Sequence, residues 1–240
     1  MFQQEWNQIL HEYKDIDNSS SSQKLKYPLS YFPNNCTKRY NTTEISVVPN
    51  DCLSIALESK KEGKTLLLNM ANETQPGGFP WLVGGQEEEL FRRTDLVTRL
   101  PKKLYPINVN ELILTKDVQI RDTPRVAQQS CAPDTIDIIS SSACKMPYNF
   151  MGTKMSVEYT GIMYRKILYL FLVALEYQYD VLILGAWGCG GYRCPPEHVS
   201  ALFKMVLEEF KGCFKKVIFA IRDTENHPKS NLNIFKQQFK

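Results

Sequence analysis

Three consecutive glutamates follow a glycine-rich segment in the stretch PGGFPWLVGGQEEELFRR, residues 76–93. Glycine lets backbone N–H groups approach an anion closely. A carboxyl group beside an apolar side chain such as Trp81 acquires a raised pKa, which suits a general acid. The hypothesis that follows is that Gln86, Glu87 or Glu88, at the start of a helix, faces a bound ligand.

The glutamates also have a simpler interpretation, in which they only stabilise a solvated helix. Acidic residues in the first turn of a helix offset its macrodipole. Glu88 precedes Arg92 by four residues, and Glu89 precedes Arg93 by the same interval, which suits surface ion pairs. Because the helix start is joined to the glycine segment, we favour the ligand-facing hypothesis for Gln86, Glu87 or Glu88, and we expect Glu89 to be the solvated partner of Arg93.

A second glycine-rich loop, GAWGCGGYRCPP at residues 185–196, follows the apolar run DVLIL and precedes a helical pattern. Ligands of open α/β sheets bind beyond the carboxyl ends of the strands, and a helix start favours phosphate. The loop fits neither the G-x-G-x-x-G fingerprint nor the G-K-[ST] motif. Together the two loops predict a cradle for a diphosphate.

Strand and helix patterns alternate along the chain, which predicts an α/β fold with a mostly parallel sheet. Asp51 is the expected cap of the first helix of this series, and Gly63 its stop. Apolar runs predict strands at 44–48, 64–70, 135–140, 179–187 and 215–221, and a strand or hairpin at 111–122. Helical spacing predicts helices at 1–17, 51–63, 86–100, 155–178, 197–210 and 229–239.

The chain of 240 residues suits one large domain. We predict that residues 1–24 form an N-terminal helical extension, ending in a serine-rich loop or linker at 17–24. Residues 25–240 then form the domain that carries both glycine-rich loops.

Composition excludes several classes of function. The net charge of +3 makes no case for nucleic acid or an anionic membrane. The longest apolar run, residues 167–175, is shorter than the ~20 residues of a membrane span and predicts a buried core helix. The seven cysteines form no C-x-x-C pair, which argues against a disulfide framework and a zinc site. The three histidines, His11, His198 and His227, are scattered, and we expect surface or structural roles for them.

We therefore expect a monomer in a reducing compartment, the cytoplasm, without membrane insertion or nucleic-acid binding. The alternative location is that of a secreted effector acting in a host cytosol.

The strings LLNMANETQPGGF and GGQEEELFRRTDL resemble the signature of poly(ADP-ribose) glycohydrolase-type macrodomains, especially the microbial branch. That signature is a glycine triplet, a short spacer and Gln-Glu-Glu. Here Gly77-Gly78-Phe79 is followed by six residues and then by Gln86-Glu87-Glu88. Further similarity runs through residues 104–122, 135–143, 184–196 and 217–223, so that the resemblance covers about residues 43–240.

The resemblance implies a macrodomain-like three-layer α/β/α sandwich with a mixed, mostly parallel sheet. It implies hydrolysis of the C1″ glycosidic bond of ADP-ribose attached to protein or to poly(ADP-ribose), without metal or cofactor. Glu88 would be the catalytic acid, and Glu87 would hold the hydroxyls of the ribose at that bond. The other implied ADP-ribose contacts are Asp51 at the adenine, Asn69, Asn72, Gly77, Gly78, Phe79 and Gln86, and the diphosphate loop of Gly188, Cys189, Gly190, Gly191 and Tyr192.

One position departs from the family pattern. Phe79 either replaces the third glycine or matches the aromatic residue that often follows a shortened triplet. In the first case its ring, with Pro80 and Trp81, crowds the cleft and favours mono-ADP-ribose on an acidic side chain or arginine over polymer. Two other functions stay open: a non-catalytic ADP-ribose reader, and a nucleotide- or phosphate-binding enzyme of flavodoxin-like topology.

Overall fold

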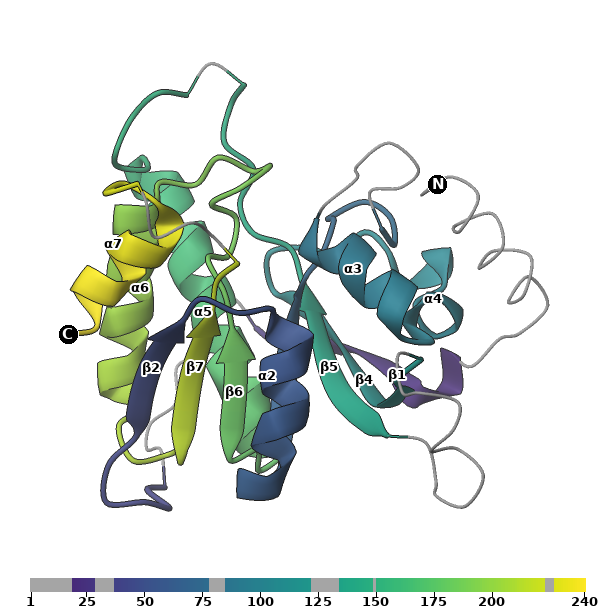
Figure 1. Cartoon of the computed structure of the whole chain (residues 1–240). Coiled ribbons are helices and arrows are strands. Elements are labelled where there is room, and N and C mark those ends of the chain that lie inside the picture. The colour runs from purple at the N-terminus through teal and green to yellow at the C-terminus, as the bar shows by residue number, and fades with distance from the viewer. Residues whose placement is uncertain (1–18, 29–36, 78–84, 122–133, 149, 223–226) are drawn as a thin grey trace. The chain divides into compact units, whose positions relative to one another are not determined.

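The computed structural model describes residues 19–28, 37–77, 85–121, 134–148, 150–222 and 227–240 (Figure 1). The chain divides into two compact units. The first comprises Met1–Leu25 and Asn69–Ser142, and the second comprises Lys26–Leu68 and Ala143–Lys240. The helix predicted over residues 1–17 lies outside the described residues, and the domain boundary expected at residue 25 stays a prediction.

Four parallel strands form the sheet of the second unit. Their order is β3 (Thr65–Met70), β6 (Val181–Leu184), β7 (Lys216–Ala220) and β2 (Glu44–Val48). Helix α2 (Cys52–Ser59) covers one face, and α5 (Val157–Glu176) and α6 (Pro196–Glu209) cover the other (Figure 1). A last helix, α7 (Asn231–Gln238), packs against α6 and β2. The predicted three-layer α/β/α arrangement is confirmed.

The strands of this sheet are mostly apolar because helices cover both faces. All four residues of β6 are buried. The predicted core helix is α5, whose residues 166–174 are buried, and no helix in the described part of the chain is long and apolar enough to cross a membrane. Aromatic rings fill the layer between α6, α7 and the sheet. The ring centroids of Phe203 and Phe219 are 5.1 Å apart, and those of Phe219 and Phe235 are 5.3 Å apart.

The first unit contains the antiparallel part of the sheet. Strand β4 (Glu111–Gln119) pairs antiparallel with β5 (Thr135–Ser141), and β1 (Ser22–Lys26) lies on the other side of β4. The last two residues of β3, Asn69 and Met70, also belong to this unit. The fold is therefore α/β with a mixed, mostly parallel sheet, as predicted, and residues 111–119 form one strand.

The single helix predicted over residues 86–100 is wrong. The chain forms α3 (Gln86–Arg93) and a short α4 (Leu96–Arg99), separated by an extended Thr94. The Thr94 hydroxyl donates to the carbonyl of Leu90 at 2.7 Å and accepts from the Leu96 N–H at 3.2 Å. Its backbone also forms an antiparallel bridge to Ile120. Helical spacing continues across this break, so the pattern alone does not reveal it.

The serine-rich segment 17–24 is not only a loop. A 3-10 turn at Ser19–Ser21 leads into β1. The Ser22 hydroxyl donates to the Arg99 carbonyl at 2.6 Å, and Lys24 forms an ion pair with Glu111 at 2.8 Å. The polar side chains of this segment are thus ordered by partners within the first unit, although the serine-rich composition predicted a loop or linker.

A buried ion pair connects three segments of the first unit. The Arg99 guanidinium donates to both carboxylate oxygens of Asp95 at 2.7–2.9 Å, and both side chains are less than a tenth exposed. Arg99 also donates to the Ser21 hydroxyl at 2.8 Å, and Asp95 accepts from the Gln119 N–H at 2.8 Å. The pair therefore links α4 to the end of β4 and to the turn before β1.

Replacing Arg99 by methionine should strongly destabilise this unit, because it leaves the Asp95 carboxylate buried without its cation. We expect the free energy of unfolding to fall by about 3–5 kcal/mol, measured by urea denaturation. The matched control is Lys215→Met, since Lys215 is 45% exposed and lies 3.9 Å from Glu62, and its loss should cost less than about 1 kcal/mol. Equal losses in the two variants would contradict the role of the buried pair.

Candidate active site

The Glu87 carboxyl is buried at the junction of β3 and α3, where its side chain is 4% exposed. The Asn69 side-chain amide donates to one oxygen at 3.2 Å, and the Asn72 backbone N–H donates to the other at 2.9 Å. The backbone N–H of Gly77 is a third donor. Both carboxyl oxygens are therefore fixed by the strand end and the loop that follows it.

The two neighbours of Glu87 complete the first turn of α3. The Gln86 side-chain oxygen accepts from the Met70 N–H at 2.8 Å, which ties the helix start to the end of β3. Glu88 is 5% exposed, and Glu89 pairs on the outside with Arg92 and with Arg93, at 3.8 Å from Arg93. The pairing of Glu89 with Arg93 agrees with the expectation for Glu89, whereas the ligand-facing role of Glu87 and Glu88 stays a prediction.

Burial raises the pKa of Glu87 to about 8, and the nearby Glu88 adds to the rise, against the lowering effect of the hydrogen bonds from Asn72, Asn69 and Gly77. The sequence pointed to a raised carboxyl pKa in this turn without settling its position. The structure assigns it to Glu87, so that this side chain is mostly protonated near neutral pH.

Asn69 and Asn72, the two asparagines that follow each other three residues apart, have different surroundings. Asn69 is fully buried and also donates to the Ser140 hydroxyl at 3.0 Å, while its side-chain oxygen has no hydrogen-bond partner. The Asn72 side-chain oxygen accepts from the Thr74 N–H at 2.9 Å and from its hydroxyl at 3.0 Å, which closes a turn. Asn69 thus acts through its side chain on Glu87, and Asn72 through its backbone.

Asp51 caps α2 in the second unit, as predicted. Its carboxylate accepts from the Ser54 N–H at 3.0 Å and from the Ser54 hydroxyl at 2.5 Å. An aspartate at this position satisfies an N–H group that the helix leaves unpaired. Its contact with adenine stays a prediction.

The second glycine-rich loop joins β6 to α6 through a tight turn. Gly188 has φ +79°, and a Cβ there would lie 2.6 Å from the Ala143 Cβ and 2.8 Å from the Cys194 sulphur. Gly190 and Gly191 have open space around them, and the carbonyl of Tyr192 accepts from the Met146 N–H at 2.9 Å. Of Gly188, Gly190 and Gly191, only Gly188 is therefore required by packing.

Cys189 and the histidines show no sign of a nucleophilic role. Burial raises the pKa of the Cys189 thiol well above its ordinary value, with Cys194 and Glu197 adding to the rise, so the thiol stays neutral. His198 accepts from the Met155 N–H at 2.9 Å, and His227 from the Lys229 N–H at 3.2 Å. Both histidines are structural, as predicted.

Several predicted features lie outside the described residues: Gly78 and Phe79 of the glycine segment, the adjoining Pro80 and Trp81, and His11. The crowding expected from Phe79 stays a prediction. Within the described part of the chain, no group of three histidine, cysteine, aspartate or glutamate side chains is placed to hold a metal ion.

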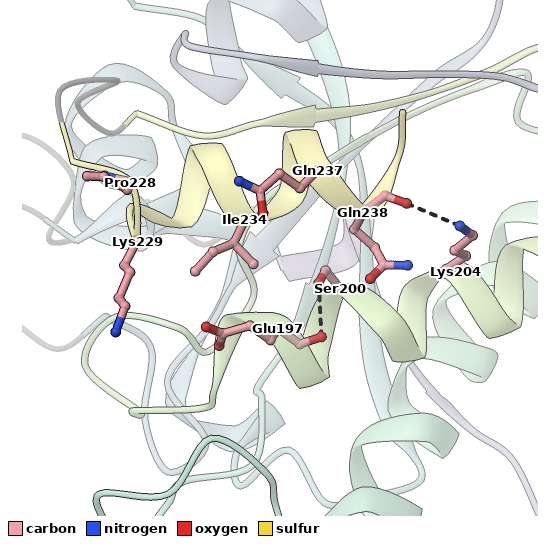
Figure 2. A pocket seen from close by; sticks show the side chains of 8 residues that line it. All are labelled: Glu197, Ser200, Lys204, Pro228, Lys229, Ile234, Gln237 and Gln238. Atoms are coloured by element: carbon pink, nitrogen blue, oxygen red, sulfur yellow. Dashed lines mark hydrogen bonds between the residues drawn. The ribbon is translucent and has the colours of Figure 1, made fainter.

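A polar cavity of about 320 Å³ lies between α6 and α7 in the second unit (Figure 2). None of the predicted site residues lines it, so it gives no support for the predicted ligand. Its lining residues are Glu197, Ser200, Lys204, Pro228, Lys229, Ile234, Gln237 and Gln238.

Replacing Gly188 by alanine should destabilise the second unit, because an L residue at this φ is strained and its Cβ meets Ala143. We expect the free energy of unfolding to fall by about 1–2 kcal/mol from the backbone strain alone, and the melting temperature to fall with it. Gly190→Ala serves as the control, since nothing lies within 4 Å of its Cβ. If the two variants melt at the same temperature, the packing requirement at Gly188 is wrong.

Replacing Glu87 by glutamine should change the pH dependence of stability. The folded pKa of about 8 lies above the ordinary 4.5, so ionisation of the unfolded chain weakens the wild-type fold as pH rises through this window. Glutamine does not ionise, and the wild-type stability should fall relative to the variant by up to about 1.4 kcal/mol per pH unit. Denaturation at pH 5 and pH 8 measures this, and a pH-independent difference would contradict it.

The family model for the microbial-type poly(ADP-ribose) glycohydrolase (PARG) catalytic domain matches residues 5–120. The match begins well before residue 43, where the resemblance was expected to start, so that expectation was too narrow. It includes β3 and the Gln86-Glu87-Glu88 helix start of the first unit. No curated protein sequence matches the chain.

Solved structures of bacterial enzymes share the fold. Poly(ADP-ribose) glycohydrolase from Deinococcus radiodurans, in complex with ADP-ribose, is 26% identical over 82% of this chain and 84% of its own, with a TM-score of 0.67. The enzyme from Thermomonospora curvata is 20% identical over 97% of this chain and 89% of its own, with a TM-score of 0.75, a likeness of fold alone. The expected resemblance is therefore confirmed: this chain carries the microbial-type PARG catalytic-domain pattern over residues 5–120 and the fold of bacterial poly(ADP-ribose) glycohydrolases.

Proposed function

We propose that this chain is an ADP-ribosyl glycohydrolase, which cleaves the C1″ glycosidic bond of ADP-ribose attached to protein or to poly(ADP-ribose). The observation that carries the proposal is the buried Glu87–Glu88 pair at the start of α3, fixed to the end of β3. A buried carboxyl pair within the Gln-Glu-Glu motif supports the acid–base chemistry that hydrolysis of a glycosidic bond requires. The similar Deinococcus radiodurans enzyme is a poly(ADP-ribose) glycohydrolase that was solved with ADP-ribose bound.

Glu88 is the general acid and base in this proposal. Its protonated carboxyl donates a proton to the atom that leaves C1″, and the bonding electrons go to that atom as the bond breaks. The resulting carboxylate then removes a proton from the incoming water, whose oxygen bonds to C1″. The position of Glu88, 5% exposed in the first turn of α3, supports this role because bulk water does not surround its carboxyl.

Glu87 holds the hydroxyls of the ribose whose C1″ bond breaks. With a pKa of about 8, its carboxyl is mostly neutral near pH 7 and both donates and accepts hydrogen bonds. The donors from Asn69 and Asn72 keep the group in one orientation.

We assign the contacts of the diphosphate and adenine parts of ADP-ribose from the family resemblance. The loop of Gly188, Cys189, Gly190, Gly191 and Tyr192 binds the diphosphate, and Asp51 accepts from the adenine amino group. The exposed backbone around Gly190 and Gly191, where no atom fills the Cβ positions, supports the first assignment because phosphate oxygens could approach it.

We further propose that Phe79 shapes the acceptor side of the site and favours mono-ADP-ribose on an acidic side chain or arginine over polymer. The support is the sequence alone, in which Phe79-Pro80-Trp81 stands where the family pattern completes a glycine triplet.

Glu88→Gln should lower the rate of ADP-ribose release by about 10²–10⁴-fold, because glutamine transfers no proton. The measurement is release of ADP-ribose from poly(ADP-ribose) and from proteins modified on arginine or on acidic residues, with ADP-ribose affinity followed by calorimetry. Glu89→Gln is the matched control, since Glu89 pairs with Arg92 and Arg93 on the outer face and should leave the rate unchanged.

Full activity of Glu88→Gln would exclude the proposed acid. Binding of ADP-ribose by the wild type without turnover of any substrate would identify a reader instead. Binding of phosphate or nucleotides but not ADP-ribose would favour a flavodoxin-like nucleotide-binding protein.

A further inference from the structure

Gly85 directly precedes α3 and is its N-terminal cap residue. Its backbone is extended, with φ −73° and ψ 155°, a conformation open to every L residue. The positive φ that calls for glycine at Gly188 is therefore not the reason for glycine here.

Helix capping does not require glycine at this position either. Serine, threonine, aspartate and asparagine are better caps in an extended conformation, because their side chains accept from the first N–H groups of the helix. Gly85 offers no such side chain, and α3 begins without a side-chain cap. Some other constraint must favour the absence of a Cβ.

The Glu88 carboxyl occupies the space that a side chain at Gly85 would need. A Cβ built on Gly85 would lie 1.9 Å from Glu88 Oε2 and 3.0 Å from the carboxyl carbon. Favourable contacts between such atoms require a separation of about 3.5 Å. A Cβ at residue 85 would therefore push the Glu88 oxygen away by roughly 1 Å or more. The Glu88 side chain thus folds back over the bare Cα of Gly85.

The displaced group is the flexible end of a side chain, and the helix backbone need not move. A substitution at Gly85 should therefore change where the Glu88 carboxyl lies without unfolding α3. In catalysis, a misplacement of about 1 Å costs on the order of 10²-fold in rate.

We propose that Gly85 is a positioning residue, whose missing side chain allows Glu88 to hold its carboxyl at the start of α3. This inference rests on the proposed function, in which Glu88 transfers the proton. It assigns to Gly85 a steric role in catalysis, distinct from the binding role proposed for the glycine segment before it.

The test compares Gly85→Ala with Gly161→Ala. Gly161 lies in α5, where an added Cβ would come no closer than 3.7 Å to another heavy atom, the Arg165 Nη2. We expect Gly85→Ala to lower kcat by about 10–100-fold. The melting temperature of Gly85→Ala should stay close to that of wild type, and its Kd for ADP-ribose should stay within about twofold. Gly161→Ala should keep the wild-type kcat and Kd, with a melting temperature no lower than wild type because alanine is the better helix former. A wild-type kcat in Gly85→Ala, or a parallel loss of melting temperature and binding, would overturn the proposal.

A second background separates displacement of Glu88 from any other effect of the alanine. In Glu88→Asp the carboxyl is one methylene shorter, and we expect it to lie farther from the Cβ position of residue 85. Adding Gly85→Ala to Glu88→Asp should then change kcat by less than about threefold, the non-additivity expected when the two residues act through one contact. An equal loss in both backgrounds would contradict a role through Glu88.

The two proposals fail in different ways. If Glu88→Gln keeps full activity, the proposed function is wrong at its catalytic acid. If Glu88→Gln is inactive while Gly85→Ala turns over like wild type, only the positioning role of Gly85 is wrong.

Discussion

The burial of the Glu87 carboxyl is the constraint on which the rest of the candidate site depends. A buried carboxyl costs several kcal/mol unless hydrogen bonds replace its water. The donors come from the last buried position of β3, Asn69, and from the loop that follows, at Asn72 and Gly77. The strand must therefore end, the loop must turn and α3 must begin where they do, and this geometry places Glu88 one residue further on.

The glycines around the start of α3 help to position the Glu87 and Glu88 carboxyl groups, in addition to any contact with a ligand. Gly77 has φ +67°, and a Cβ there would lie 3.3 Å from the Phe91 ring, so its conformation and packing both favour glycine while its N–H reaches Glu87. Gly85 leaves room for the Glu88 carboxyl. A glycine-rich segment that suggests a ligand loop is, at these two positions, also the support of the acidic pair.

The second glycine-rich loop follows different rules. Gly188 is fixed by packing against Ala143 and Cys194, whereas Gly190 and Gly191 face open space. A loop with one packed glycine and two open ones has a fixed turn and an accessible backbone. That combination suits the anion contact proposed for this loop.

The sequence by itself determined the strands and helices with strong periodicity, the Asp51 cap and the burial of α5, because these follow from local spacing and capping. It also singled out the acidic pair through a motif. Only the tertiary structure revealed the helix break at Thr94, the strand β1, and the raised pKa of Glu87. Each of these is decided by partners distant in the sequence: hydrogen bonds to another strand, an ion pair across the first unit, and the removal of water by packing around one carboxyl.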